Sequence, residues 1–269
     1  MQGIRDKVAI VSGGALSIGA EIVRAFVEQG ARAIIADVNR EAGESLAGEL
    51  GDKVLYVPMD LAVDAEIEAG VKSALDTFGR IDFVVNAAAI YQDQGPDSGR
   101  ADWTRSFEVN VIGPVMLARA ARSALAATKG VIVNIGSISA RVAQAGRWTY
   151  PASKAALAQA TRSLALDLAG DGIRVNSVSP GWTWSSGMEQ LGLKRPIVDK
   201  VAGAFHLMGR AADRREIADA VLFLCSDHAR FITGADLAVD GGYTAMGPEG
   251  RPSALAAVAA AMQEAEHDH

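Results

Sequence analysis

Short apolar segments alternate with helical patterns along nearly the whole chain, and this alternation is the feature that most limits the possible folds. Strands of a parallel sheet are covered on both faces, so they are continuously apolar rather than alternating. Seven segments have this character: residues 8–11, 33–37, 54–59, 83–87, 130–137, 174–179 and 237–240. Helical periodicity lies between them, at residues 20–29, 64–78, 103–127 and 152–169. The sequence therefore predicts an α/β fold, a doubly wound parallel sheet of about seven strands with helices on both faces.

Composition supports a globular protein and disfavours several kinds of partner. The 269 residues are 49% hydrophobic and 22% charged, enough to bury a sizeable core. A net charge of −6, with acids and bases interspersed, does not suit nucleic acid phosphates. The first apolar run, of about five residues, is too short for a signal peptide or a membrane span. The single cysteine and the four histidines show no disulfide or metal spacing. We therefore expect a cytoplasmic protein without a metal, and neither nucleic acid nor membrane as a partner.

The segment after the first predicted strand has a composition suited to binding phosphate. SGGALSIG, residues 12–19, leads directly into a helical pattern. Glycines let the backbone approach a pyrophosphate, and a helix N-terminus offers free N–H groups and a positive dipole end. The spacing departs from the strict G-x-G-x-x-G, so a purely structural turn is the alternative interpretation.

Two acidic residues end the second and third predicted strands. Asp37 follows Gly19 by 18 residues, close to the roughly 20 expected for the acid that binds the adenosine ribose. A carboxylate there repels a 2′-phosphate, and Val38 and Asn39 offer no cation, so NAD(H) is favoured over NADP(H). Asp60 is placed to receive an adenine amino group. For both residues a simple turn is the alternative, because aspartate is common in turns.

Tyr150 and Lys154 are four residues apart and project from one face of a predicted helix. A free tyrosine has a pKa of about 10, which is too high for a base at neutral pH. A nearby ammonium and a bound nicotinamide cation would lower this pKa. Ser137 ends the fifth predicted strand, 13 residues before Tyr150. A Tyr-x-x-x-Lys pair alone is weak support, because most such pairs are surface residues.

Together these motifs resemble the short-chain dehydrogenase/reductase family. The likeness runs from about Arg5 to Tyr243 and includes SGGALSIG, VNAAAI, SPG at residues 179–181 and the segment ITGADLAVDGGY. It implies a single-domain Rossmann-type fold, a nicotinamide dinucleotide, a small-molecule substrate and a homotetramer or homodimer. We expect residues 1–246 to form the dinucleotide-binding and catalytic domain, with a flap at 186–209 over the substrate or simply packed there. The Ala-rich tail at 247–269 is expected to be partly helical.

The resemblance also implies roles for four catalytic residues. Tyr150 would exchange a proton with the substrate oxygen, which Ser137 would also hydrogen-bond. Lys154 would bind the nicotinamide ribose and lower the pKa of Tyr150, while Asn110 would hold a water of the proton relay. The predicted cofactor site comprises Ser12, Gly13, Ser17, Ile18, Gly19, Asp37, Asp60, Leu61, Asn86, Ala88, Tyr150, Lys154, Pro180, Gly181, Thr183 and Ser185.

The chain departs from the family pattern at four places. Ser12 and Ser185 replace threonines and keep the hydroxyl. Ser17 replaces a glycine of the first loop, where we expect it to fit the helix start as a capping residue. The usual Asn-Asn-Ala-Gly is Asn86-Ala87-Ala88-Ala89, which removes one side-chain amide and adds a methyl at the glycine position. That change puts the local bracing of the backbone in doubt, but it touches none of the four catalytic positions.

Aromatic side chains gather in sequence around the predicted site. Flat, rigid rings favour a flat or cyclic ligand and exclude water. Trp182 packing only on the nicotinamide region and Trp148 facing another subunit are the alternatives. The candidate substrate contacts are Tyr91, Gln144, Trp148, Trp182, Trp184 and Met188.

The sequence thus predicts an NAD(H)-dependent oxidoreductase that transfers a hydride between the nicotinamide and a small cyclic or aryl secondary alcohol or ketone. An NAD(P)H-dependent reductase of 3-oxoacyl or other ketones is the alternative, since the same residues work in both directions. A non-catalytic dinucleotide-binding protein is less favoured, because it needs no Ser-Tyr-Lys set. A sugar-nucleotide epimerase needs an appended nucleotide-sugar domain, for which the chain leaves little room.

Overall fold

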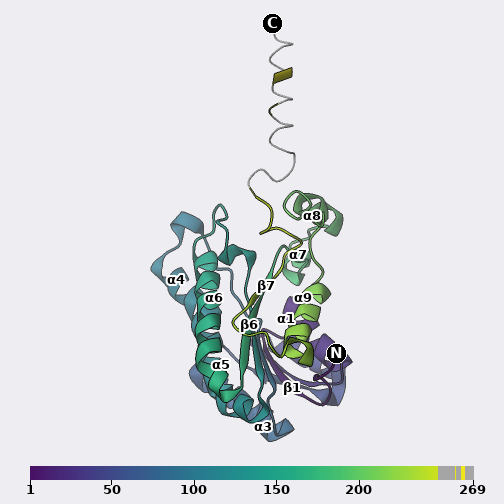
Figure 1. The fold of residues 1–269 in the computed structure, drawn as a ribbon. Helices are drawn as coiled ribbons and strands as arrows, with labels where there is room; N and C mark the ends of the chain where they lie inside the picture. The colour runs from purple at the N-terminus through teal and green to yellow at the C-terminus, as the bar shows by residue number, and fades with distance from the viewer. Residues whose placement is uncertain (248–257, 259–261, 264–269) are drawn as a thin grey trace.

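The computed structural model describes residues 1–247, 258 and 262–263, and a parallel sheet lies at its centre (Figure 1). Within these residues the sheet has seven strands in the order β3-β2-β1-β4-β5-β6-β7. They are β1 Val8–Ser12, β2 Arg32–Asp37, β3 Val54–Pro58, β4 Phe83–Asn86, β5 Val131–Ile135, β6 Arg174–Pro180 and β7 Asp236–Val239. The predicted fold class is confirmed. Because the order reverses between β1 and β4, the loops after these two strands diverge and open a crevice at the carboxyl edge.

Helices cover both faces of the sheet, as Figure 1 shows for α1 and α9 on one side and α3, α5 and α6 on the other. Successive residues of a strand point to opposite faces, so Ala9 and Val11 join one core and Ile10 the other. This division explains why the strand segments are apolar without alternation. The helices are α1 Ser17–Glu28, α2 Arg40–Leu50, α3 Asp64–Phe78, α4 Arg100–Phe107, α5 Gly113–Thr128, α6 Thr149–Leu168, α7 Ser186–Gln190, α8 Arg195–Ala202 and α9 Arg214–Cys225. Short 3-10 turns cover Gly51–Lys53, Gly95–Asp97, Ile138–Ala140, Ala169–Asp171 and Asp227–Ala229.

The helix predicted over residues 103–127 is not one regular α-helix. Helix α4 passes into a π-helical turn, Glu108–Ile112, before α5 begins. Pro114 lies at the start of α5 and has no N–H to donate to the carbonyl of Asn110, so the regular hydrogen-bond ladder is interrupted here. The π-helical turn contains Asn110, one of the four predicted catalytic residues.

The predicted flap contains α7 and α8, while the predicted tail lies almost wholly outside the described residues. In that tail only residues 247, 258 and 262–263 are described, and the side chains of Val258 and Met262 are exposed. None of the helices in the described part of the chain combines the length and the apolar character needed to cross a membrane.

The backbone at the start of α1 corrects the expectation for Ser17. This residue has φ of +53°, and no side chain caps the helix, whose N-cap position is held by Leu16. Ser17 is therefore no capping residue but a left-handed one, at a position that favours glycine. Ala89 also replaces a glycine of the family pattern, but its φ is not positive. Only the Ser17 substitution strains the backbone.

We predict that Ser17→Gly stabilises the protein by about 1 kcal/mol, because a non-glycine residue in the left-handed region costs about 1–2 kcal/mol. Urea unfolding followed by circular dichroism measures the difference. Ser73→Gly is the matched control, since Ser73 lies inside α3 and the same change there should destabilise by up to about 1 kcal/mol. Equal effects of the two substitutions would contradict the assignment of strain to Ser17.

Candidate active site

Helix α6 presents Tyr150 and Lys154 on one buried face, beside Ser137 in the loop after β5. Their exposed fractions are 5%, 2% and 8%. The Ser137 Oγ accepts the Ser139 N–H at 3.1 Å and lies near enough to the Tyr150 phenol to lower its pKa. The Nζ of Lys154 lies 5.6 Å from the centre of the Tyr150 ring and donates to the Ile135 carbonyl at 2.7 Å. The predicted set is thus assembled, with the lysine held against the end of β5.

Burial dominates the electrostatics of this pair. It lowers the pKa of Lys154 to about 8, so the side chain is still mostly an ammonium at neutral pH. Burial raises the pKa of Tyr150 well above its usual value, and the Tyr91 phenol adds to this effect. Ser137 and the charge of Arg147 act in the opposite direction. Tyr150 is therefore a proton donor at neutral pH until further positive charge comes next to it.

Asn110 connects the π-helical turn to two other elements of the site. It is fully buried, and its Oδ1 accepts the Ile90 N–H at 2.9 Å. Its Nδ2 donates to the Ile90 carbonyl and to Ser153 Oγ, both at 3.1 Å. Ser153 in turn donates to the Tyr150 carbonyl at 2.7 Å. Asn110 thus braces the loop after β4 against α6 through Ser153, which was not among the predicted site residues.

Tyr91 lies directly on the Tyr150 phenol. The ring centroids of Tyr91 and Tyr150 are 4.5 Å apart with 26° between the planes, and the two hydroxyl oxygens are 3.5 Å apart. Tyr91 is 65% exposed. It therefore forms one wall of the approach to Tyr150.

The loops after β1 and β4 approach each other very closely. A Cβ on Gly13, which has φ of +66°, would lie 2.6 Å from the backbone of Ala88, and one on Gly19 would lie 1.9 Å from the Gly13 carbonyl oxygen. Ser12 Oγ and Asn86 Oδ1 are the buried side-chain atoms of the described residues that lack a hydrogen-bond partner. They belong to paired residues at the carboxyl ends of β1 and β4. This edge of the sheet therefore offers a narrow backbone cradle with two unused oxygens.

The predicted adenosine contacts also brace the protein itself. Asp37 accepts the N–H groups of Ala15 at 3.0 Å and Asn39 at 2.9 Å, so it supports the loop of residues 12–19. Asp60 forms an ion pair with Arg105 at 3.0 Å. Although burial raises its pKa, the hydrogen bonds from Ala62 and Arg105 bring the pKa of Asp60 below its usual value. Of the other predicted contacts nearby, Leu61 is buried and Ile18 packs against the core around α1.

The turn after β6 is held by His206, which was not among the predicted site residues. The Trp182 N–H donates to His206 Nε2 at 3.1 Å, and His206 Nδ1 lies 2.8 Å from the Ala202 carbonyl oxygen. A Cβ on Gly181 would lie 2.7 Å from that Nε2 atom, so glycine is required beside the buried ring.

The other predicted cofactor residues of this turn contact the protein itself. Thr183 donates to the Gly181 carbonyl at 3.2 Å. Pro180 is buried at the end of β6, and Ser185 caps α7 through the Met188 N–H at 3.4 Å.

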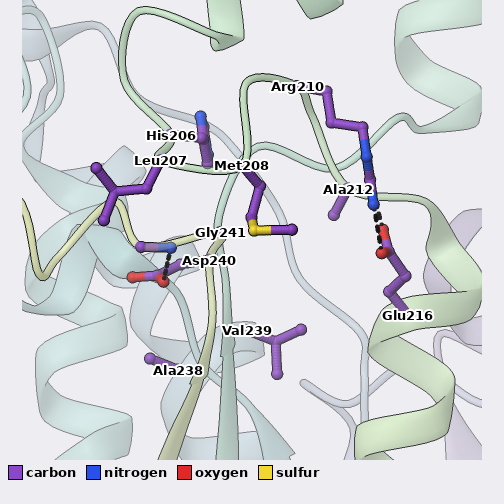
Figure 2. Close-up of a pocket in the computed structure, with 11 residues that line it drawn as sticks. His206, Leu207, Met208, Arg210, Ala212, Glu216, Ala238, Val239, Asp240 and Gly241 are labelled. Carbon is purple, nitrogen blue, oxygen red and sulfur yellow. Dashed lines mark hydrogen bonds and ion pairs between the residues drawn. The ribbon is translucent and has the colours of Figure 1, made fainter.

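A cavity of about 400 Å³ lies on the other side of His206, at the carboxyl end of β7 (Figure 2). The ion pair between Arg210 and Glu216, at 2.7 Å, closes one flank. None of the predicted cofactor or substrate residues lines this cavity. It is therefore separate from the catalytic set.

The predicted substrate contacts divide into two groups. Trp182, Trp184 and Met188 pack around a small core of the flap formed by Val198, Ala202 and Ala211. Gln144 accepts a hydrogen bond from Ser139 at 2.7 Å, and Trp148, next to α6, is 52% exposed. Among the predicted substrate residues, Tyr91 contacts Tyr150 directly.

Comparison with known proteins identifies the family. A family model described as enoyl-(acyl carrier protein) reductase matches residues 13–244. The chain is 38% identical over 251 residues to cis-4-hydroxycyclohexanecarboxylate dehydrogenase of Sinomonas cyclohexanicum, covering 91% of this chain and 99% of the relative. The chain belongs to the short-chain dehydrogenase/reductase family. It is also 37% identical over 250 residues to a Comamonas cyclopentanol dehydrogenase, covering 91% of this chain and all of the relative.

A solved member of this family has the same fold. It is a 7α-hydroxysteroid dehydrogenase in complex with NADH and 7-oxo glycochenodeoxycholic acid. It superimposes with a TM-score of 0.83 and 29% identity, covering 89% of this chain and 96% of that one. The family binds a nicotinamide dinucleotide, and the cradle at Gly13 and Gly19 with the unpartnered Ser12 and Asn86 oxygens fits such a group.

The shift of Lys154 predicts a pH-dependent stability in this short-chain dehydrogenase. A lysine whose pKa falls from 10.5 unfolded to about 8 folded destabilises the protein below pH 8, and this cost disappears as the pH rises to 10.5. The unfolding free energy of the unmodified protein should therefore rise relative to Lys154→Met by about 3 kcal/mol over that range.

Urea titrations of both proteins between pH 7 and 10.5 measure this difference. The control is Lys72→Met on α3, whose side chain is 73% exposed and whose difference from the unmodified protein should stay nearly constant. A constant difference for Lys154→Met as well would show that the lysine is not desolvated in the folded protein.

Proposed function

We propose that this protein is an NAD(H)-dependent oxidoreductase that interconverts a secondary alcohol and its ketone, with Tyr150 as the acid/base. The observation that carries the proposal is the buried group of Tyr150, Lys154 and Ser137 at the carboxyl edge of the sheet. The dehydrogenase names of the relatives support the reaction class. A non-catalytic dinucleotide-binding protein would have no use for a buried lysine beside a buried phenol, since both are costly to desolvate.

The nicotinamide, when bound, supplies the acceptor or donor of the hydride. The chain itself handles the proton and the substrate oxygen. Ser137 Oγ and Tyr150 Oη are placed to hydrogen-bond that oxygen, and the protonated phenol donates to it when a ketone is reduced. In the opposite direction Tyr150 first loses its proton to water, the Lys154 ammonium, 5.6 Å from the ring centre, stabilises the resulting phenolate, and the phenolate Oη then accepts the alcohol proton.

We propose small cyclic or aryl secondary alcohols as the substrate class. Two relatives are named for cyclic alcohols, cis-4-hydroxycyclohexanecarboxylate and cyclopentanol. Tyr91 supports the same choice, because its exposed ring beside Tyr150 offers a flat surface for a ring to stack on. The family model's description refers to an acyl carrier protein substrate, so a reductase of 3-oxoacyl or related thioesters is the second candidate.

We also propose that the enzyme is cytoplasmic and forms a homotetramer or a homodimer. Leu166 on α6 and Phe231, which are 78% and 102% exposed, support self-association, because large apolar side chains on a surface mark contact sites.

The substrate proposal predicts that cyclohexanol-type and 1-arylethanol substrates have a higher kcat/KM than 2-butanol or a 3-hydroxyacyl thioester. Absorbance of the NADH formed measures the rates. Tyr150→Phe is the control: turnover should fall by orders of magnitude while NADH binding, followed by fluorescence, stays nearly intact, because only the proton transfer is removed. A faster acyclic alcohol or thioester would overturn the substrate class, and near-normal kcat in Tyr150→Phe would overturn the mechanism.

The cofactor proposal predicts that NAD⁺ exceeds NADP⁺ in kcat/KM by at least about tenfold, or roughly 1.4 kcal/mol. The reason is that the Asp37 carboxylate repels the 2′-phosphate of NADP⁺. Neither the exposed Val38 nor Asn39 carries a positive charge that could bind this phosphate. Asp37→Ala should shrink the ratio, but it also removes the support of the Ala15 N–H. Asp37→Asn removes the charge and keeps one of the two acceptor oxygens for the Ala15 and Asn39 N–H groups, so it should shrink the ratio with less loss of stability than Asp37→Ala. Equal use of both cofactors by the unmodified enzyme would contradict the proposal.

A further inference from the structure

Asp93 joins the loop after β4 to the beginning of the catalytic helix. Its Oδ1 accepts the N–H groups of Gly95 at 3.0 Å and Trp148 at 2.9 Å, and its Oδ2 accepts the Tyr150 N–H at 2.9 Å. Two of these donors lie 55 and 57 residues further along the chain. The carboxylate thus holds the backbone of the acid/base residue itself.

The beginning of α6 needs such a partner. The first N–H groups of a helix have no acceptor within the helix, and Trp148 at the N-cap position provides no capping side chain. Asp93 provides the acceptor from another loop, and its negative charge suits the positive end of the helix dipole. Although burial alone raises it, the pKa of Asp93 lies below its usual range because these N–H groups stabilise the carboxylate. A second bond closes the same junction, from Thr149 Oγ1 to the Gln92 carbonyl at 2.9 Å.

The junction also fixes Tyr91, which directly precedes Gln92. With residues 92 and 93 bound to residues 148–150, the Tyr91 ring stays stacked on Tyr150 at 4.5 Å. The two phenols therefore keep one relative position only while this junction is closed.

We infer that Asp93 is a positioning residue for the acid/base of this enzyme: it sets the first turn of α6 and the stacking of Tyr91 on Tyr150. The inference rests on the proposed function of Tyr150. Asp93 acts through the backbone and the neighbouring ring, and the structure shows no bond from its carboxylate to the Tyr150 phenol.

Asp93→Asn is the sharpest test, because it keeps size and an acceptor oxygen for Gly95 and Trp148 but turns an NH₂ group toward the Tyr150 N–H. We expect kcat for alcohol oxidation to fall at least tenfold, with the Kd for NADH, measured by fluorescence, changed by less than twofold. Asp102→Asn is the matched control. Asp102 also holds a backbone N–H at a helix start, that of Gly99 at 2.8 Å, but on α4, and its substitution should leave kcat unchanged.

A decrease in kcat for Asp93→Asn no larger than that for Asp102→Asn overturns the inference, as does an equal loss of NADH binding. If Asp93→Asn does not fold, Thr149→Val tests the same junction by removing the bond to the Gln92 carbonyl. It should lower kcat severalfold with NADH binding intact, and an unchanged kcat overturns the inference.

Amide hydrogen exchange separates this inference from the proposed function. In Asp93→Asn the amides of residues 91–95 and 148–152 should lose protection together, because one carboxylate holds both segments. If the unmodified protein oxidises none of the alcohols, the proposed function fails, and the exchange result then decides whether Asp93 couples the two segments. Unchanged protection in either segment overturns the coupling.

Discussion

A chain of buried hydrogen bonds determines where helix α6 lies on the sheet. Asn86 on β4 donates to Asn134 on β5 at 2.8 Å, and Asn134 donates to Thr161 on α6 at 2.9 Å. All three side chains are buried, so a shift of α6 along β5 would leave polar groups without partners at about 1–3 kcal/mol each. The bond from Lys154 to the Ile135 carbonyl fixes the same helix nearer the site. The positions of Tyr150 and Lys154 thus follow from a polar network inside an otherwise apolar core.

Much of the fold could be predicted because the strands have a strong local signal. Most strands are apolar on both faces, and every strand boundary lies within two residues of its prediction. Helix α2 gave a weaker signal, because Leu46 is its only buried residue with a large side chain. The π-helical turn could not be read from periodicity, since it arises from the missing N–H of Pro114 in a stretch that still looks helical.

From residue spacing alone the site was predictable only where its residues share one element, and Ser137 and Asn110, on other elements, were predicted from the family resemblance. Tyr150 and Lys154 are four residues apart on α6, so their common face follows from helix geometry. No periodic pattern connects Asp93 with Tyr150 or His206 with Trp182, because these pairs form only when the chain folds. The two altered glycine positions show the same limit. Ser17 and Ala89 each replace a glycine of the family pattern, yet of the two only Ser17 has a positive φ.

The burial that raises the pKa of Tyr150 and lowers that of Lys154 also makes the two groups suitable partners. Each charge is disfavoured alone in this environment, so the neutral phenol is the resting form. A phenolate formed beside an ammonium is less costly than either ion by itself, because the two charges attract strongly where water is excluded. In the proposed mechanism Tyr150 therefore loses its proton only while Lys154 is charged, and regains one from the substrate alcohol. In that mechanism the same desolvation that makes the pair costly to fold favours proton exchange with a substrate oxygen bound at Tyr150 beside Tyr91.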